Sequence, residues 1–191
     1  MKHPNVKSFK YIIKTHGFDL SKIDISGVSL SECDLRNVKL RKDRNLFQKI
    51  EGKNLYGTLL PERDFSRYNF RNVLLKNTVF QLNTILPKSK NLFQRVKRKD
   101  ISFCVMPCID YTIYNFKNVC IKGAVFPEDA PFPKDYSFFQ NIKYKDCRGT
   151  IFPLDVIKSL HLYNLRGVKI DLDIYNLSEY QKAIINKKIH T

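Results

Sequence analysis

The sequence predicts an all-β solenoid, on the strength of two superimposed periodicities. Residues 18–42 divide into the fives FDLSK, IDISG, VSLSE, CDLRN and VKLRK, and the third residue of each is Leu or Ile. A period of five fits neither the 3.6-residue period of an α-helix nor the simple alternation of a strand. The segments LFQKI, LFQRV and FFQNI add a longer period, since they begin at residues 46, 92 and 138. Repetition at fixed spacing is typical of stacked repeats.

The register of fives extends over most of the chain and is broken at regular places. The first run of unit centres comprises Leu20, Ile25, Leu30, Leu35, Leu40, Asn45, Ile50, Leu55, Leu60, Phe65, Phe70, Leu75 and Phe80, of which only Asn45 is polar. Each 46-residue repeat equals seven units plus 11 residues. We therefore expect two 11-residue loop excursions, at 83–93 and 129–139.

The units IDISG, CDLRN and YNFRN carry a family resemblance. They are similar to the pentapeptide repeat, whose consensus is a small residue, Asp or Asn, Leu or Phe, and two variable residues. The chain resembles a divergent member of the pentapeptide-repeat family with a 46-residue super-repeat, over residues 18–172. The resemblance implies a right-handed, four-sided (quadrilateral) β-helix of about six to seven coils, with unit centres pointing inward. Six long side chains depart from the small-residue position of the consensus, so their sides must be distorted or the side chains must turn outward: Gln48, Gln94, Gln140, Lys53, Lys99 and Lys145.

Helical patterns flank the repeats within what we expect to be a single domain. Val6, Phe9 and Ile13 form an apolar stripe before Gly17, which predicts an N-terminal helical cap over 1–17. The repeats then occupy 18–174. Ser178 and Gln181 have the spacing of a capping box, which predicts a C-terminal helical cap over 175–191.

The composition is strongly basic, with a formal net charge of +16. Such a charge attracts polyanions at long range. However, 24 of the 34 basic residues are Lys, which leaves open a codon bias in an AT-rich genome. No secretion signal or membrane span is expected, because long apolar runs are absent from the sequence. We therefore expect a cytoplasmic protein, and export by a route without a signal peptide remains open.

The sequence contains no strong motif for catalysis or metal binding. Five cysteines form no CxxC pair, and we expect them to pack as small apolar residues. His3, His16, His161 and His190 lie mostly in the expected caps, so neither a triad nor a metal cluster is predicted. We expect no catalytic residues, no metal site and no cofactor.

One side of the expected rod collects basic residues. Candidate contacts for an anion or a partner on this side are Lys49, Arg71, Arg95, Lys97, Arg98, Lys117, Lys143 and Arg166. One interpretation is an anion-binding stripe for nucleic-acid phosphate or an acidic protein. The other is a solvated face of a Lys-rich chain.

A second side is apolar where the family pattern has Asp or Asn. Its candidate contact residues are Leu59, Val79, Val105, Val125 and Ile151. An apolar surface of that length predicts a cover. The sequence favours the two excursions as this cover, through Ile85, Leu86, Phe132 and Tyr136, over a partner chain or a homodimer. It also favours an interior position for Tyr68, Tyr114 and Tyr163 over a surface on which nucleic-acid bases stack.

These observations predict a non-catalytic binding scaffold that recognises an unidentified protein partner through the basic side and possibly the apolar side. The alternative is a nucleic-acid-binding protein that uses the basic stripe. A second alternative comes from the resemblance alone, since some family members imitate DNA and bind topoisomerases. The net charge of +16 disfavours that role. A monomer and a homodimer are both open.

Overall fold

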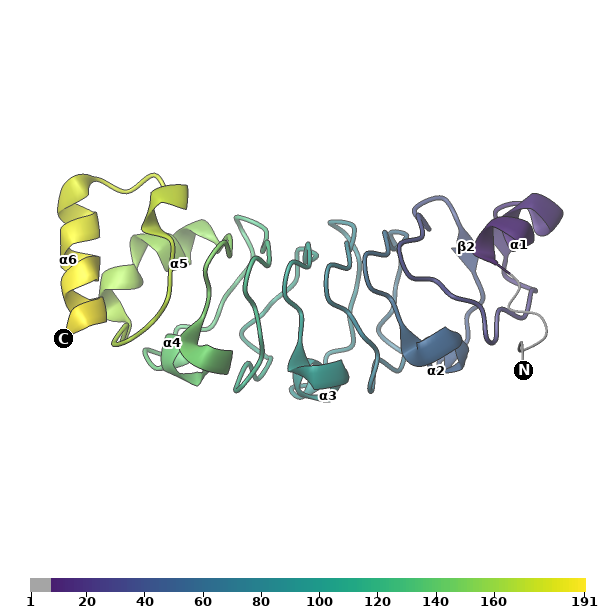
Figure 1. Cartoon of the computed structure of the whole chain (residues 1–191), viewed down its shortest axis with the longest axis horizontal. Coiled ribbons are helices and arrows are strands. Elements are labelled where there is room, and N and C mark those ends of the chain that lie inside the picture. The colour runs from purple at the N-terminus through teal and green to yellow at the C-terminus, as the bar shows by residue number, and fades with distance from the viewer. Residues whose placement is uncertain (1–7) are drawn as a thin grey trace, which may run out of the picture.

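The structure is a computed structural model that describes residues 8–191. Val6 and His3 lie outside the described residues. Figure 1 shows an elongated molecule in which successive loops of chain lie side by side, with α1 (Phe9–His16) near one end and α6 (Glu179–His190) at the other. Between them lie β1 (Asp19–Leu20), β2 (Lys39–Leu40), α2 (Leu46–Lys49), η1 (Glu51–Lys53), α3 (Leu92–Arg95), η2 (Lys97–Lys99), α4 (Phe138–Asn141), η3 (Lys143–Lys145), α5 (Leu154–Lys158), η4 (Leu160–Leu162) and η5 (Leu172–Ile174).

The predicted all-β fold is wrong. Among residues 8–191 the structure has six α-helices and a single sheet of two parallel strands, β1 and β2, which does not close. The right-handed four-sided β-helix and the solenoid expected from the repeats are therefore not supported. Elsewhere in the described chain, parallel pairing is limited to isolated bridges such as Leu59 to Val79 and Val79 to Val105.

Turns within the five-residue units explain why strands do not form. In successive units the carbonyl of the central residue accepts a hydrogen bond from the N–H three residues later, as in Leu55 to Thr58 (3.1 Å) and Leu75 to Thr78 (2.9 Å). Such an i to i+3 bond defines a β-turn. Each unit therefore keeps about one extended residue, the one before its centre, which suffices for a single bridge and not for a ladder.

The central residues fill the interior, as the period predicts. Leu20, Leu35, Leu55 and Leu60 are completely buried, and Phe65 is too. Towards the C-terminal half the interior becomes aromatic, and a cluster there comprises Tyr111, Phe116, Phe126, Phe132, Phe138 and Phe152. Burial of this apolar surface is the main favourable term in folding.

The excursions differ from the prediction in number and position. Asn45 is no unit centre, because it is the N-cap residue of α2. Three excursions recur at a spacing of 46 residues, over 41–49, 87–95 and 133–141, and α2, α3 and α4 form their last residues. The first was missed because its coil, from Asp34 to Leu59, has 25 residues and so keeps the register of fives, whereas the later two coils with an excursion have 26.

We call one circuit of the chain, 20 to 26 residues between bridged positions such as Leu59, Val79 and Val105, a coil. Residues with a left-handed backbone form one corner of successive coils. The corner residues, all with φ between 58° and 65°, are Gly52, Asn72, Arg98, Asn118, Tyr144 and Gly167. Lys53, Lys99 and Lys145 follow directly and also have positive φ. The distortion expected at these three lysines is confirmed.

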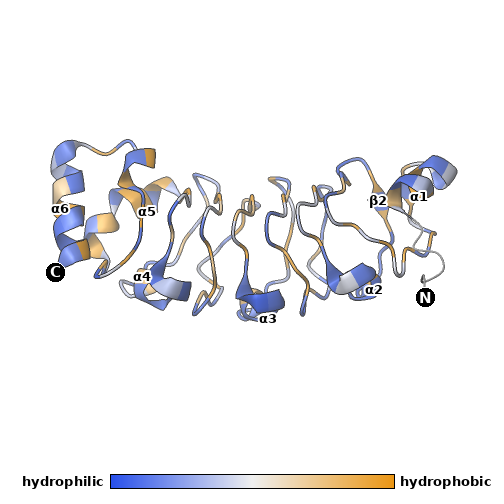
Figure 2. Ribbon diagram, viewed as in Figure 1, coloured by the Kyte–Doolittle hydropathy of each residue, from blue (hydrophilic) through white to orange (hydrophobic). Residues whose placement is uncertain are grey.

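Helices at both ends agree with the sequence patterns. In α1 Ile12 is the buried residue, whereas Phe9 and Ile13 of the predicted stripe are partly buried, and Gly17, with a φ of 67°, ends the helix. Ser178 caps α6, and its hydroxyl and the Gln181 side chain form the predicted capping box. Figure 2 shows that α6 is mainly hydrophilic, and Ile185 is its buried residue. The division into caps and repeats at 17 and 174 stays an interpretation.

Candidate anion-binding groove

Each excursion is clamped by a tyrosine from the following coil. The hydroxyl of Tyr68 donates to the carbonyl of Arg41 (2.8 Å), and Tyr114 and Tyr163 donate to the carbonyls of Pro87 and Pro133. All three rings are buried, which confirms their interior position. Burial raises the pKa of Tyr114 to about 12. These rings therefore hold the excursions rather than offering faces to bases.

A glutamine in each short helix joins the excursion to the next coil. The Nε2 of Gln48 donates to the carbonyls of Asn69 and Arg71, both at 2.9 Å. Gln94 and Gln140 make the same pair of bonds one and two repeats later. These three glutamine side chains turn out of the interior, which is one of the two outcomes that the sequence predicted for them.

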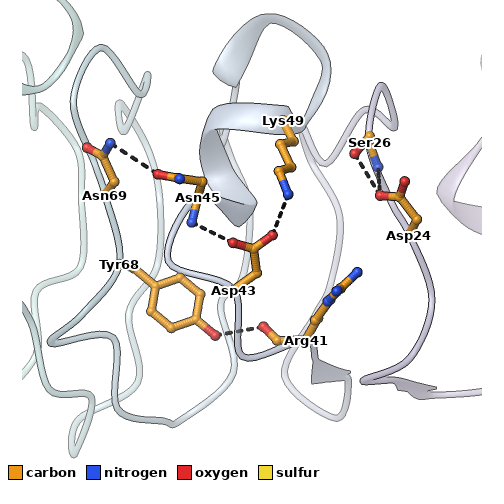
Figure 3. A network of polar contacts seen from close by, with 8 residues as sticks. All are labelled: Asp24, Ser26, Arg41, Asp43, Asn45, Lys49, Tyr68 and Asn69. Atoms are coloured by element: carbon orange, nitrogen blue, oxygen red, sulfur yellow. Dashed lines mark hydrogen bonds and ion pairs between the residues drawn. The ribbon is translucent and has the colours of Figure 1, made fainter.

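Asp43 orders the first excursion (Figure 3). Its Oδ1 accepts from the backbone N–H of Asn45 (2.8 Å), and its Oδ2 accepts from Nζ of Lys49 (2.7 Å). These bonds, with Lys49 first, hold the pKa of Asp43 below its usual range. Asn69 of the next coil also contacts Asn45 at 3.5 Å. The first excursion is thus held against the next coil, and the candidate site lies beside it.

Two adjoining cavities lie beside this excursion. The first, of about 380 Å³, lies between the excursions that contain α2 and α3, and the second has about 620 Å³. They share Arg44, Ser66, Arg67 and Tyr68 as lining residues. We call the pair the basic groove, because six basic residues line it: Lys42, Arg44, Arg63, Arg67, Arg71 and Arg95. Asp64 is the one carboxylate in the lining.

The groove's positive charges are largely uncompensated. None of the six belongs to the ion pairs found among residues 8–191. Arg63 is held in place, since its guanidinium donates to the Leu40 carbonyl (2.9 Å) and lies 5.4 Å from the Tyr68 ring centre. The other five are exposed. Asp64 is itself bonded to Ser66, which lowers the pKa of its carboxyl.

A copy of the first cavity occurs one repeat later with less charge. Its volume is about 340 Å³, and Tyr114, Asn115, Phe116 and Pro133 replace Tyr68, Asn69, Phe70 and Pro87. The charged positions differ: Lys90 stands for Arg44, Lys117 for Arg71, Asn141 for Arg95, Asp135 for Ser89, and the residue 46 positions after Arg67 is Ile113. The same frame therefore carries four arginines in one copy and two lysines with an aspartate in the other.

The basic residues singled out by sequence lie in different surroundings, and a continuous stripe stays a prediction. Arg71 and Arg95 line the groove, Lys117 lines its copy, and Lys49 is paired with Asp43. The remaining four lie outside these cavities: Lys97 and Arg98 in η2, Lys143 in η3, and Arg166 on the following coil.

Sequence reasoning missed four groove residues, Lys42, Arg44, Arg63 and Arg67. A signal was present, since eight of the ten arginines fall between residues 36 and 98. Arginine is less easily attributed than lysine to the codons of an AT-rich genome.

The apolar column is continuous and partly exposed among residues 8–191. Consecutive bridges join Leu59, Val79, Val105, Val125 and Ile151. Val105 is 37% exposed and Ile151 38% exposed. The excursions do not cover this column: Leu86 and Phe132 are buried in the interior, while Ile85 and Tyr136 are exposed. That expected cover is wrong, and a contact at this column stays a prediction.

The cysteines vary in environment. Cys104 and Cys147 are buried, and Cys108 is exposed. Burial raises the pKa of the Cys104 thiol to about 12. The two buried thiols pack as small apolar residues, whereas Cys33 and Cys120 are half-buried, so the prediction is confirmed for two of the five cysteines.

Comparison with known proteins gives no relative. No protein-family model matches the chain, and neither a curated protein nor a solved structure matches it. Among residues 8–191, no helix is both long enough and apolar enough to cross a bilayer.

Proposed function

We propose that this chain is a non-catalytic binding protein that holds a single-stranded nucleic acid by its phosphates in the basic groove. The observation that carries the proposal is the set of six basic residues around two adjoining cavities, with Asp64 as the one acidic lining residue. Arginine presents five donors in a planar fork that matches phosphate geometry. The net charge of +16 adds long-range attraction for a polyanion.

The shape of the groove favours a flexible strand. Its charges line cavities of about 380 and 620 Å³ rather than a flat face. Cavities of this size take a small ligand or a short length of chain. Partly exposed Pro87 forms part of the wall, so a base or sugar can rest on its apolar atoms while phosphates contact the arginines.

Binding of a fluorescent single strand of mixed sequence tests the proposal. We expect affinity to fall steeply between about 50 and 200 mM salt, because bound counterions are released. Contacts from all six basic residues would give a log–log slope of about −4. Absence of binding at the lower salt concentration contradicts the proposal. An acidic polypeptide of equal charge serves as competitor, and its tighter binding would assign the groove to an acidic protein partner instead.

A further inference from the structure

The first cavity of the groove carries more charge than an internal phosphate requires. Arg44, Arg67, Arg71 and Arg95 line it, and no carboxylate does. An internal phosphodiester carries one negative charge, whereas a phosphomonoester carries about 1.5 to 2 at pH 7. Four arginines with no internal counterion therefore suit a terminal phosphate better than one link of a continuous backbone.

Comparison with the copy separates charge from framework. Both cavities use the same clamp, in which Tyr68 or Tyr114 donates to the carbonyl of Arg41 or Pro87. In both, a glutamine of a short helix donates to the carbonyl of a lining asparagine, Asn69 or Asn115. Because the framework is the same, the arginines are not needed to form the cavity. Their presence in one copy alone points to a ligand.

The remaining lining fits the unit next to a phosphate. Ser66 and Ser89 supply hydroxyl groups, while Phe70, Pro87 and Leu92 supply apolar wall. Hydroxyl donors and guanidinium forks both bind phosphate oxygens. An apolar wall accepts a base or sugar face. A volume of about 380 Å³ is near the lower end of the range for small-ligand pockets.

We propose that the cavity lined by Arg44, Arg67, Arg71 and Arg95 binds a phosphomonoester at the end of a nucleic-acid strand. This inference rests on the proposed nucleic-acid binding and adds recognition of a strand end to it. The second cavity, with Lys42 and Arg63, then receives the adjoining internal phosphates.

Three otherwise identical oligonucleotides test this assignment: one with a 5′-phosphate, one with a 3′-phosphate and one with hydroxyl groups at both ends. We expect one phosphorylated strand to bind at least about tenfold more tightly than the hydroxyl strand. Equal affinity of all three overturns the inference and leaves the proposed function standing. No binding of any strand contradicts the proposed function itself.

Residues exchanged between the two copies supply variants with compatible surroundings. Arg67→Ile combined with Arg95→Asn gives the first cavity the uncharged residues that its copy has at these two positions, and we expect the preference for phosphorylated ends to disappear. Ile113→Arg combined with Asn141→Arg makes the reverse change as a control, with the original preference retained. Circular dichroism and urea unfolding establish that both variants fold. Retention of the full preference by the first variant overturns the inference.

Two competitors distinguish other sources of the same phosphate chemistry. Adenosine monophosphate presents a phosphomonoester without a strand, and a phosphoserine peptide presents one on a protein. We expect neither to displace the phosphorylated strand below about 1 mM, because neither reaches the second cavity. Displacement by either at strand-like concentrations overturns the assignment to a strand end.

Discussion

At the residue scale, the corner positions show which side chains the fold tolerates and which it does not require. Gly52, Asn72 and Asn118 suit a left-handed backbone, since Gly lacks Cβ and Asn tolerates this region. Arg98 occupies the same corner with a φ of 60°. Its side chain belongs to none of the ion pairs among residues 8–191. The backbone strain at Arg98 is therefore not compensated by an ion pair in the part of the chain that the structure describes.

Replacing Arg98 with the residue of a neighbouring corner should stabilise the protein. We expect Arg98→Asn to raise the free energy of unfolding by about 0.5–1 kcal/mol, because left-handed backbone costs other L-residues about 1–2 kcal/mol. Urea denaturation measures the change. Arg166→Asn removes the same charge at an exposed position outside the left-handed set, and it should stay within about 0.5 kcal/mol. A lower free energy of unfolding in Arg98→Asn would contradict the backbone strain inferred at this position.

The glutamine bridges should contribute to stability in a measurable way. Gln48→Ala removes both bonds to the carbonyls of Asn69 and Arg71. We expect a loss of about 1–2 kcal/mol in the free energy of unfolding, from two hydrogen bonds at a partly exposed site. Gln81→Ala is the matched control, since Gln81 is also half-buried. Equal losses in the free energy of unfolding from the two substitutions, measured by chemical denaturation, would contradict a stabilising role for the glutamine bridge.

At the scale of the element, each five-residue unit is a small turn that its own side chains complete. Oδ1 of Asp24 accepts from the N–H of Ser26 (3.0 Å), and Asn54 makes the equivalent bond to Tyr56 (2.8 Å). Asp and Asn favour such turns because their side-chain oxygen accepts a hydrogen bond from the backbone N–H two residues later, as a carbonyl oxygen does in a backbone turn. The repeated Asp or Asn thus encodes turns, and turns interrupt strands.

The aspartate turns should make the protein sensitive to acid. Bonds from Ser26 lower the pKa of Asp24, and bonds from Ser66 do the same for Asp64. A carboxyl whose pKa is lower in the folded state contributes stability above its unfolded pKa, near 3.9, and loses that contribution as the pH falls through the folded pKa. The urea midpoint should therefore decrease between about pH 5 and pH 2.

The variant Asp24→Asn isolates this effect, because Asn keeps the turn, as Asn54 does, without the charge. We expect the variant to be less stable than the wild type at pH 7 and equally stable near pH 2. A difference in stability that stays the same at both pH values contradicts the assignment.

Particular elements show what the sequence could predict. The buried centres, the three interior tyrosines and the Ser178 capping box follow from local spacing, so they were predictable. The all-β assignment failed because periodicity identifies inward residues without fixing how many residues between them are extended. The groove was missed because Arg44, Arg67 and Arg95 come together only when successive coils are aligned. That alignment depends on the excursion at 41–49, which the register of fives concealed.

At the scale of the whole molecule, charge is unevenly distributed over a regular framework. The three excursions repeat the same clamp and bridge, yet the arginines concentrate around the first cavity, while its copy contains Asp135. A uniform excess of lysine would give attraction to any polyanion without a preferred place. The proposed site is therefore defined by its location and not by charge alone.

Two variants with equal net charge test this claim most directly. One removes the groove arginines Arg44, Arg67, Arg71 and Arg95 by substitution with Ala, and the other replaces exposed Lys10, Lys158, Lys169 and Lys187 with Ala. Each lowers the formal charge from +16 by four, to +12. Single-strand affinity is measured for both across a salt series. We predict that the groove variant loses at least about 100-fold in affinity and shows a shallower salt slope, while the lysine variant stays within about fivefold of the wild type. Equal losses in the two variants would contradict the groove as the binding site.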